Sequence, residues 1–263
     1  MDIQFKWVGA ATFILKINSI KIAADPVLCK KDTIQDYTWF KSHRIEDPVF
    51  EDSDFDDVDI WFLTHAHEDH LDKEGAAIIK TDSHIISEKK AGKKLLKMGN
   101  KYPLLHTMEW EERKKIQIKN CLITIKTIPA IHGRRGYSAF FAGKVNGYFV
   151  EFQFPDESFS IYITGDTVLK NSVVAPLKKE YISLLIPNLG AVKKNTWMDL
   201  LTMDMDMLLA MNKILEPEFI IPIHYNTFSH YTEKKEVIVK KSPMNMVISD
   251  PGVVTELSYS CKI

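Results

Sequence analysis

Alternating apolar and polar residues at the start of the chain predict a β-meander. The pattern favours three short strands, over Ile3 to Val8, Thr12 to Ile17 and Ile20 to Asp25. Gly9 and the pair Asn18-Ser19 interrupt this pattern, and such residues are typical of turns. The sequence therefore predicts antiparallel strands joined by tight turns at its amino end.

Residues 26–57 break this regularity. Pro26 and Pro48 stand among aspartates and aromatic residues, and no period connects the apolar positions. Long irregular segments inside compact domains often form lids or binding loops, so this segment is a candidate wall of a substrate pocket. A surface insertion with no role in binding is an equally good interpretation of the same pattern.

From residue 59 onward, the pattern predicts helices and strands that alternate. Asp59 to Thr64 is an apolar run of strand length, and segments of helical period follow it. Runs rich in Phe, Tyr and Val then predict a second meander, with Asn146-Gly147 as its hairpin turn. The expected helices span residues 73–80, 88–98, 172–179 and 202–215, with a short one after Glu233, and the expected strands span residues 84–86, 113–128, 137–154, 161–164, 182–186 and 219–223. This order predicts sheets covered by helices.

Length and charge narrow the class of protein. The 263 residues are enough for one large hydrophobic core, and neither a repeat nor a linker interrupts them, so we expect a single domain over residues 1–263. The formal net charge is −1, with 26% charged residues. Such a balance offers no general attraction for a polyanion, so a nucleic-acid partner is not expected.

Cysteine usage and hydropathy predict a cytoplasmic location. Cys29, Cys121 and Cys261 are far apart and form no CxxC pair, so a disulfide framework is not expected. No stretch approaches the roughly 20 apolar residues that a membrane-spanning helix needs. We therefore expect no membrane partner.

The residues that carry chemistry concentrate in residues 64–72. This run holds three imidazoles and three carboxylates directly after an apolar strand, and such a mixture at short spacing suits a transition-metal site. His67 and His70 stand at i and i+3, which excludes the helical zinc-protease motif with its i, i+4 pair. In an extended segment His65 and His67 project to the same side, while the following turn redirects Asp69 and His70. One loop could therefore serve two metal ions.

Three further residues that can bind metal share one position in the pattern. His132, Asp166 and His224 each follow a short apolar run that is predicted to be a strand. Strand ends on one rim of a sheet can converge on a cleft. A single His in an apolar setting is more often a hydrogen-bonded core residue, but the recurrence favours a shared site.

Together these residues resemble the metallo-β-lactamase superfamily, whose hydrolases carry H-x-H-x-D-H followed by a His, an Asp and a His. Every position of that pattern is matched here. The resemblance extends to Trp7 to Ile14, to Asp25-Pro26, and to residues 164–167 and 222–225. Within the superfamily the chain is most similar to the branch of L-ascorbate-6-phosphate lactonase-like hydrolases.

The resemblance implies an α/β fold of four layers, an αββα sandwich in which two mixed β-sheets lie face to face with helices outside. It also implies two divalent metal ions at one edge of the sheets, and self-association into a homo-oligomer. Zn is the expected metal, with Mn or Fe as alternatives, because imidazole–carboxylate sites accept all three. By position, the first ion would be held by His65, His67 and His132, the second by Asp69, His70 and His224, and Asp166 would bridge them.

The same resemblance implies a binuclear metal-dependent hydrolase. A hydroxide that bridges two ions is a nucleophile at neutral pH, since metal binding lowers the pKa of water from 15.7 to about 7. We expect it to cleave an ester, lactone or phosphodiester bond in a small-molecule substrate, with a phosphorylated sugar lactone as one candidate. Asp69 is expected to accept a proton while it coordinates, and Tyr225 to donate to a substrate oxygen.

Four other residues are candidates for supporting roles. Asp25 and Asp72 are expected to orient ligating imidazoles, because metal-bound His usually donates its other N–H to a carboxylate or carbonyl. Arg134 and Arg135 follow a predicted ligand closely, so a guanidinium there could clamp a phosphate or carboxylate of the substrate.

Other activities share this scaffold. Flavodiiron redox proteins usually place Glu at the second motif position, so His67 argues against that class. Nucleases and phosphodiesterases of the same fold share the ligand set, and a non-catalytic metal-binding sensing module could also keep it. His43 and His230 lack motif support and are expected at the surface.

Overall fold

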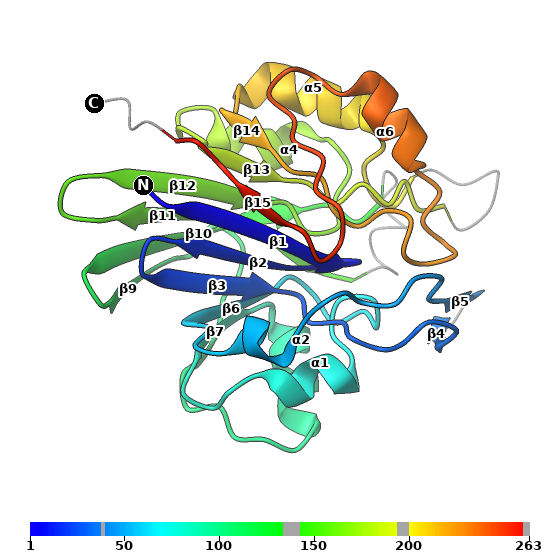
Figure 1. The fold of residues 1–263 in the computed structure, drawn as a ribbon, viewed down its shortest axis with the longest axis horizontal. Coiled ribbons are helices and arrows are strands. Elements are labelled where there is room, and N and C mark those ends of the chain that lie inside the picture. The colour runs from blue at the N-terminus through cyan, green and yellow to red at the C-terminus, as the bar shows by residue number, and fades with distance from the viewer. Residues whose placement is uncertain (38–39, 134–142, 194–199, 260–263) are drawn as a thin grey trace.

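The computed structural model describes residues 1–37, 40–133, 143–193 and 200–259, and its strands form two large sheets and one hairpin (Figure 1). The strands of the first sheet are β1 (Ile3–Gly9), β2 (Thr12–Ile17), β3 (Ile20–Ala24), β6 (Ile60–Leu63), β7 (His84–Ser87), β8 (Leu105–Thr107) and β15 (Val254–Glu256). Their order across the sheet is β15-β1-β2-β3-β6-β7-β8. The predicted opening meander, β1 to β3, is confirmed as antiparallel, and the strands from β3 to β8 run parallel.

The second sheet consists of β9 (Arg113–Ile118), β10 (Cys121–Ala130), β11 (Val145–Gln153), β12 (Ser158–Ile163), β13 (Leu184–Ile186) and β14 (Phe219–Ile220). The strands follow the order β14-β13-β12-β11-β10-β9. Those from β9 to β12 are antiparallel, whereas β12, β13 and β14 run parallel. Both sheets are therefore mixed, as expected.

Helices cover the outer faces of the two sheets (Figure 1). The first sheet is covered by α1 (Lys73–Ile78) and α2 (Lys89–Lys97), and the second by α4 (Asn171–Val174), α5 (Met205–Leu215) and α6 (Lys235–Lys241), while short 3-10 turns lie at Asp52–Phe55 and Ala175–Leu177. Side chains of Asp72, Glu88 and Asp204 accept backbone N–H groups at the starts of α1, α2 and α5, which satisfies donors that a helix start leaves free. The predicted αββα sandwich is confirmed.

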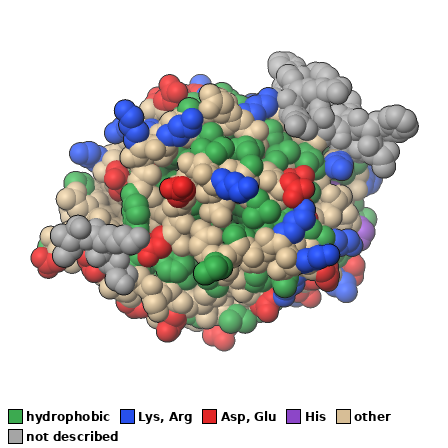
Figure 2. All heavy atoms as spheres, turned by 90° about the horizontal axis from the view of Figure 1, so that it is seen from above, with side chains coloured by type: hydrophobic (Ala, Val, Ile, Leu, Met, Phe, Trp, Pro, Cys, Tyr) green, Lys and Arg blue, Asp and Glu red, His purple; other side chains and the backbone are tan. Residues whose placement is uncertain are grey.

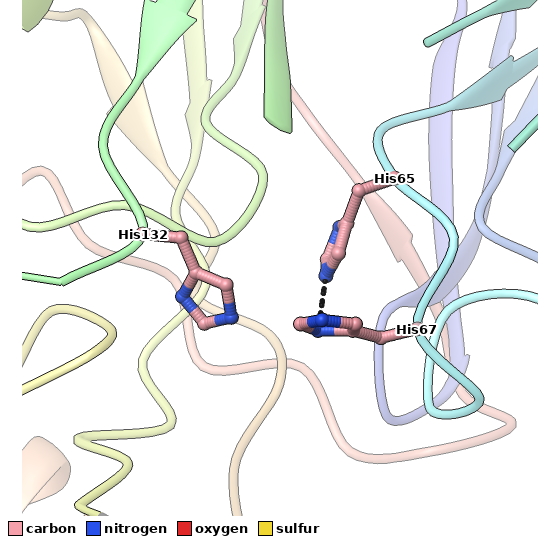
Figure 3. A group of neighbouring side chains, drawn as sticks. All are labelled: His65, His67 and His132. Atoms are coloured by element: carbon pink, nitrogen blue, oxygen red, sulfur yellow. Dashed lines mark hydrogen bonds between the residues drawn. The ribbon is translucent and has the colours of Figure 1, made fainter. Parts of the chain in front are cut away.

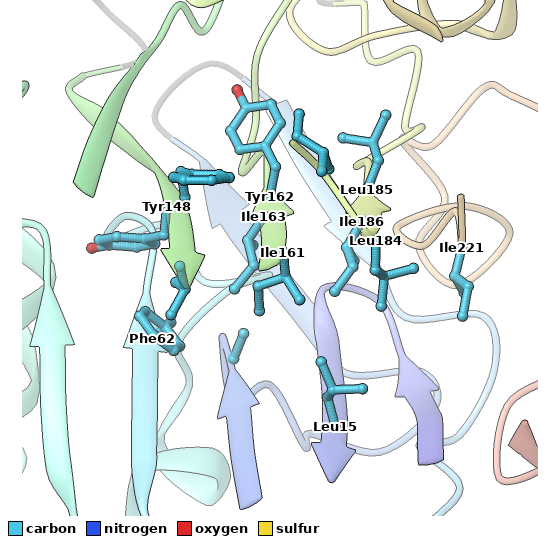
Figure 4. Packing of buried hydrophobic residues seen from close by; sticks show 14 of the residues in the cluster. Leu15, Phe62, Tyr148, Ile161, Tyr162, Ile163, Leu184, Leu185, Ile186 and Ile221 are labelled. Carbon is cyan, nitrogen blue, oxygen red and sulfur yellow. The ribbon is translucent and has the colours of Figure 1, made fainter. Parts of the chain in front are cut away.

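Strand alternation separates two hydrophobic clusters. Phe5, Leu15 and Phe62 point from the first sheet into the space between the sheets, while Trp61 and Leu63 lie on its other face with α1 and α2. Figure 4 shows Leu15 and Phe62 opposite Ile161, Leu184 and Ile186 of the second sheet. Each such fully buried side chain contributes roughly 1.5–3 kcal/mol to folding. Packing between the sheets thus fixes the strands relative to one another, and with them the positions of their carboxyl ends.

The surface is mixed in charge on the face that carries α5 and α6. Figure 2 shows Lys and Arg side chains interspersed with Asp and Glu, and among the side chains described there neither sign forms a broad patch. No helix in the described ranges is long and apolar enough to cross a membrane.

The predicted hairpin turn at Asn146-Gly147 is wrong. Both residues lie within β11, where they pair with Pro129 and Ile128 of β10. Gly147 instead allows close packing, since a Cβ there would lie 3.2 Å from the Thr164 carbonyl oxygen. A glycine in a strand pattern can mark such an approach as well as a turn, and only the tertiary contacts distinguish the two.

Residues 26–57 are more ordered than their sequence suggests. They contain the hairpin of β4 (Ile34–Tyr37) and β5 (Phe40–His43), which is separate from both large sheets. Gln35 on β4 donates to the backbone oxygen of Glu68 at 2.9 Å. This bond attaches the hairpin to the loop that follows β6.

Candidate metal centre

The seven predicted ligands come together at the carboxyl ends of four strands. His65, His67, Asp69 and His70 follow β6, His132 follows β10, Asp166 follows β12, and His224 follows β14. Each offers a nitrogen or oxygen atom to one of two groups, within which all ligand atoms lie within 4.8 Å of one another. Both groups could hold a metal ion.

The first group consists of His65, His67 and His132. Figure 3 shows His65 and His67 facing His132 from the opposite side of the site. His65 Nε2 lies 3.0 Å from His67 Nδ1. Three imidazoles with converging nitrogens leave an open coordination position on a tetrahedral ion, which is the arrangement of catalytic zinc sites.

The second group consists of Asp69, His70, Asp166 and His224, all buried. Nε2 atoms of His70 and His224 lie 3.0 Å apart. Asp166 Oδ1 lies 3.3 Å from His70 Nε2 and 3.5 Å from His224 Nε2. The group combines two imidazoles with two carboxylates, so its donors are harder than those of the first group.

Asp166 faces both groups. Its Oδ2 lies 3.9 Å from His65 Nε2 and 3.7 Å from His132 Nε2, while its Oδ1 faces the second group. Asn188 Nδ2 donates to Oδ1 at 2.9 Å and fixes the carboxylate plane. One carboxylate thus presents one oxygen to each group.

Hydrogen bonds on the outer side orient the imidazoles. Asp25 Oδ2 accepts from His70 Nδ1 at 2.8 Å and from Thr64 Oγ1 at 2.6 Å. Thr64 Oγ1 in turn lies 3.0 Å from His65 Nδ1, and His132 Nδ1 donates to the Leu201 carbonyl at 2.9 Å. Protons held on the outer nitrogens of His65 and His132 leave their Nε2 lone pairs free to face the site.

Burial keeps the first group neutral. Burial, followed by the neighbouring His132, lowers the pKa of His67 to about 3. Burial, together with the neighbouring His70 and His67, also lowers the pKa of His65 well below its ordinary value. Burial lowers the pKa of His132 as well, although the carboxylate of Asp166 acts in the opposite direction. Neutral imidazole is the form that binds metal.

The second group is charged. Burial alone would lower the pKa of His70, but the carboxylates of Asp166 and Asp25 raise it well above its ordinary value. Burial by itself would raise the pKa of Asp69, but contacts with His224 and His230 hold it well below the usual range. Burial would likewise raise the pKa of Asp166, but nearby His224 and His70 hold it well below the usual range. A buried pair of ionised carboxylates favours a bound cation.

Two further observations fit metal ions at this site. Asp69 Oδ1 is buried and has no hydrogen-bond partner among the described residues, although buried polar atoms are usually satisfied. A Cβ at Gly190 would lie 2.9 Å from His224 Nδ1 and 3.0 Å from Thr202 Oγ1, so only glycine admits the His224 ring here. The donor set and the close nitrogen pairs therefore suit two divalent cations.

Tyr225 does not lie with the metal groups. His224 has a left-handed φ of 67°, and the following Tyr225 ring packs on Trp7 with centroids 4.6 Å apart. Its buried hydroxyl has no hydrogen-bond partner in the described part of the chain. The geometry therefore does not support the expectation that Tyr225 donates a hydrogen bond to a substrate oxygen.

Asp72 also lies away from the imidazoles. Its Oδ1 accepts from Gly75 N at 2.6 Å, and its Oδ2 accepts from Cys29 N at 2.7 Å. Asp72 therefore caps α1 and binds the backbone of residue 29. Asp25 and Asp72 were both expected to orient a ligating imidazole, and among the described contacts only Asp25 does so. Arg134 and Arg135 lie outside the described residues, so the anion clamp stays a prediction.

Three residues near the site were not predicted from the sequence. His230 Nε2 lies 3.1 Å from Asp69 Oδ2, and the Tyr231 hydroxyl donates to the same oxygen at 3.0 Å. The His230 side chain is only 8% exposed, so its expected surface position is wrong. Tyr37 on β4 packs its ring edge-on at 6.0 Å from that of His67. No motif marks these residues, because they reach the site through loops whose positions depend on the tertiary fold.

We expect Asp25→Asn to weaken zinc binding by about 10- to 100-fold, because the carboxylate that orients His70 is lost. Asn tolerates the left-handed φ of 41° at this position. Asp72→Ala is the matched control, and it should lower the free energy of unfolding by about 1 kcal/mol while zinc affinity stays unchanged. Competition with a chromophoric chelator and urea unfolding measure the two quantities. Equal losses of zinc affinity in both variants would contradict the assignment of Asp25.

Acid should destabilise the metal-free protein between pH 6.5 and about 3. Below pH 6.5 the unfolded chain protonates its histidines, whereas folded His67 stays neutral down to about pH 3. The unfolded state then binds more protons, so the free energy of unfolding falls as pH falls, by about 1.4 kcal/mol per pH unit for each such group. Urea unfolding of chelator-treated protein measures this slope, and His67→Gln should reduce it. A stability that does not change between pH 6.5 and 4.5 would contradict the prediction.

The fold and these two groups define a class, the metal-dependent hydrolases built on an αββα sandwich. A family model described as the β-lactamase superfamily domain matches residues 25–225. The chain is 25% identical to a metal-dependent hydrolase of Christiangramia forsetii over 257 residues, which are 95% of this chain and 97% of the relative.

Two solved structures share the whole fold. One, described as a possible metal-dependent hydrolase from Veillonella parvula, has a TM-score of 0.83 at 21% identity and covers 98% of this chain and 100% of its own. The other is an isothiocyanate hydrolase from Delia radicum gut bacteria, with a TM-score of 0.81 at 20% identity, covering 97% and 100%. The chain belongs to the metallo-β-lactamase superfamily and is a metal-dependent hydrolase. The narrower similarity to the lactonase-like branch stays a prediction.

Proposed function

We propose that this protein hydrolyses an ester, lactone or phosphodiester bond in a small molecule, with two divalent metal ions in the groups described above. The observation that supports this most strongly is Asp166, whose two oxygens face different groups at 3.3–3.9 Å. A shared carboxylate is what two neighbouring cations need. In this proposal His65, His67 and His132 hold one ion, Asp69, His70 and His224 hold the other, and Asp166 contacts both.

The donor set favours zinc, with manganese or iron as alternatives, because imidazole and carboxylate suit all three. When bound, such ions supply Lewis acidity and a water whose pKa is about 7 in place of 15.7. Hydrolysis by such a water needs no Ser or Cys nucleophile. Tyr231 and His230 both contact Asp69 Oδ2, so this carboxylate is held in one orientation.

The β4–β5 hairpin forms the wall of the substrate pocket in this proposal. Tyr37 and Phe40 stack at 4.8 Å, and Phe40 lies 5.6 Å from the ring of His230. Burial, and after it the nearby carboxylate of Asp69, raises the pKa of Tyr37 well above its ordinary value, so the phenol stays protonated. In the structure the Tyr37 hydroxyl donates to Gln35 Oε1 at 2.7 Å. We assign to this hydroxyl, once it turns from Gln35 to a bound substrate, the donation to a substrate oxygen that the sequence had assigned to Tyr225.

Tyr37→Phe should lower kcat by about 10- to 100-fold, because a hydrogen bond to a developing charge is worth roughly 1.5–3 kcal/mol. The matched control is Tyr225→Phe, which removes the same hydroxyl from a ring that packs on Trp7 instead and should leave kcat unchanged. Steady-state kinetics on one substrate compare the two variants. A larger loss in Tyr225→Phe would reverse the assignment.

The proposal is tested by assaying the purified protein against a panel of generic carboxylic esters, lactones, phosphorylated sugar lactones and phosphodiesters. The isothiocyanate hydrolase similarity adds an aryl isothiocyanate to the panel. Turnover that a chelator abolishes and added zinc or manganese restores supports the proposal and names the bond. Two bound metal equivalents without turnover of any panel member would favour a sensing module instead.

A further inference from the structure

A second pocket lies apart from the metal groups. It has a volume of about 590 Å³ and is lined by the loop around Glu46, by Trp7 and Tyr225, and by residues 250–251. Its apolar part includes the half-exposed side chains of Ile45 and Val49. The described ligand atoms of the metal groups belong to none of these residues, so the pocket is a separate site.

The inner wall of the pocket carries an unpaired hydroxyl. Tyr225 is 1% exposed, and its hydroxyl has no hydrogen-bond partner among the described residues. A buried polar group without a partner destabilises the folded state, and a ligand in the pocket would supply that partner. Trp7 donates its indole N–H to the Ala10 carbonyl at 2.9 Å. Its ring is only 2% exposed and packs on Tyr225, so it lines the pocket as part of the core.

The charges around the pocket are unequal. Three carboxylates line it, Glu46, Asp47 and Asp250, against the two ammonium groups of Lys31 and Lys235. Asp250 pairs with Lys235, and Asp47 accepts from the backbone N–H of residue 31. Within the described ranges the Glu46 carboxylate has neither an ion pair nor a hydrogen bond, and it lines the same pocket as Tyr225. The ammonium group of Lys31 is unpaired among the described residues, but three carboxylates against two ammonium groups still leave the pocket with a net negative charge.

We propose that this pocket binds a small organic cation, a primary ammonium group attached to an apolar or aromatic body. The ammonium would donate to the Glu46 carboxylate and to the Tyr225 hydroxyl oxygen. The apolar body would pack on the half-exposed side chains of Ile45 and Val49, beside Trp7, where an ammonium near aromatic rings gains a cation–π attraction. This site is independent of the hydrolytic activity proposed above.

Calorimetric titration of the full-length protein with phenethylammonium chloride tests the site, with 3-phenylpropionate as the anionic probe of the same size. We expect phenethylammonium to bind at least about fivefold more tightly, which corresponds to one partly exposed ion pair. The titration is repeated on chelator-treated protein, because an amine could otherwise coordinate a bound metal. Unchanged affinity after chelation places the probe outside the metal groups.

Glu46→Gln should weaken phenethylammonium binding by about fivefold, and Tyr225→Phe by about threefold. Glu151→Gln, an exposed acid on β11, is the matched control and should leave the affinity unchanged. Glu46 is exposed, so its variant tests the site even if Tyr225→Phe does not fold. Equal binding of the two probes, loss of binding on chelation, or an unchanged affinity in Glu46→Gln would each overturn the proposal.

Discussion

Asp166→Ala is expected to reduce the bound metal from two equivalents to at most one and to lower turnover on the order of 1000-fold. Its carboxylate presents one oxygen to each group of ligands, and no other ligand in the described part of the chain belongs to one group and faces the other in this way. Without it the first group keeps three imidazoles, while the second keeps Asp69 as its only carboxylate. Two nearby cations then lack the charge that offsets their repulsion, and several kcal/mol of transition-state stabilisation are lost.

Elemental analysis of protein purified without added metal, followed by kinetics on the best panel substrate, measures both effects. Asp156→Ala, at an exposed position between β11 and β12, is the control and should retain the metal content and turnover of the parent. Asn188→Ala should give an intermediate loss, because Asn188 only fixes the orientation of Asp166. An Asp166→Ala protein that still holds two equivalents would exclude the bridging role.

Metal removal is expected to lower the thermal unfolding midpoint by about 10 °C. The buried carboxylates of Asp69 and Asp166 have low pKa values and remain ionised, so without a cation only neighbouring imidazoles, first that of His224 and then that of His70, offset their charge among the described groups. A ligand present at 1000 times its dissociation constant stabilises the folded state by about 4 kcal/mol, and each kcal/mol shifts the midpoint by roughly 2–4 °C in a domain of this size.

Differential scanning fluorimetry with and without a chelator measures this shift, and added zinc or manganese should reverse it. The same chelator should move the midpoint of Asp166→Ala by much less, since that variant binds less metal. A parent midpoint that is insensitive to the chelator would show that the groups are unoccupied in the purified protein, contrary to the proposal.

The part of the site that came from the sequence consists of residues with local markers. Asp69 and His70 stand in a short run after an apolar strand, and His132 and His224 stand at predicted strand ends. Side chains in such places share one edge of a sheet whatever the details of the loops. Asp25 was expected to orient an imidazole, and it contacts His70.

Predictions based on adjacency in the chain fared worse. Tyr225 was assigned to the site because it follows His224, yet the left-handed backbone at His224 and the packing on Trp7 place it beside another pocket. Asp72 stands in the motif run but serves as a helix cap. Neighbours in sequence share a site only when the backbone between them keeps their side chains on one side.

The pattern of the sequence alone determined the opening meander, the alternation of helices and strands and the ligand types, because hydrophobic period and ligand spacing are local properties of the chain. The four-layer αββα arrangement was implied by the resemblance to a known family. Only the tertiary structure decided which oxygen of Asp166 faces which group, that His230 and Tyr231 contact Asp69, and that the β4–β5 hairpin attaches to the metal loop through Gln35. Those contacts join residues far apart in the chain. Their geometry depends on how the two sheets pack and on the positions of irregular loops. The pattern of side chains along the sequence does not predict either of these.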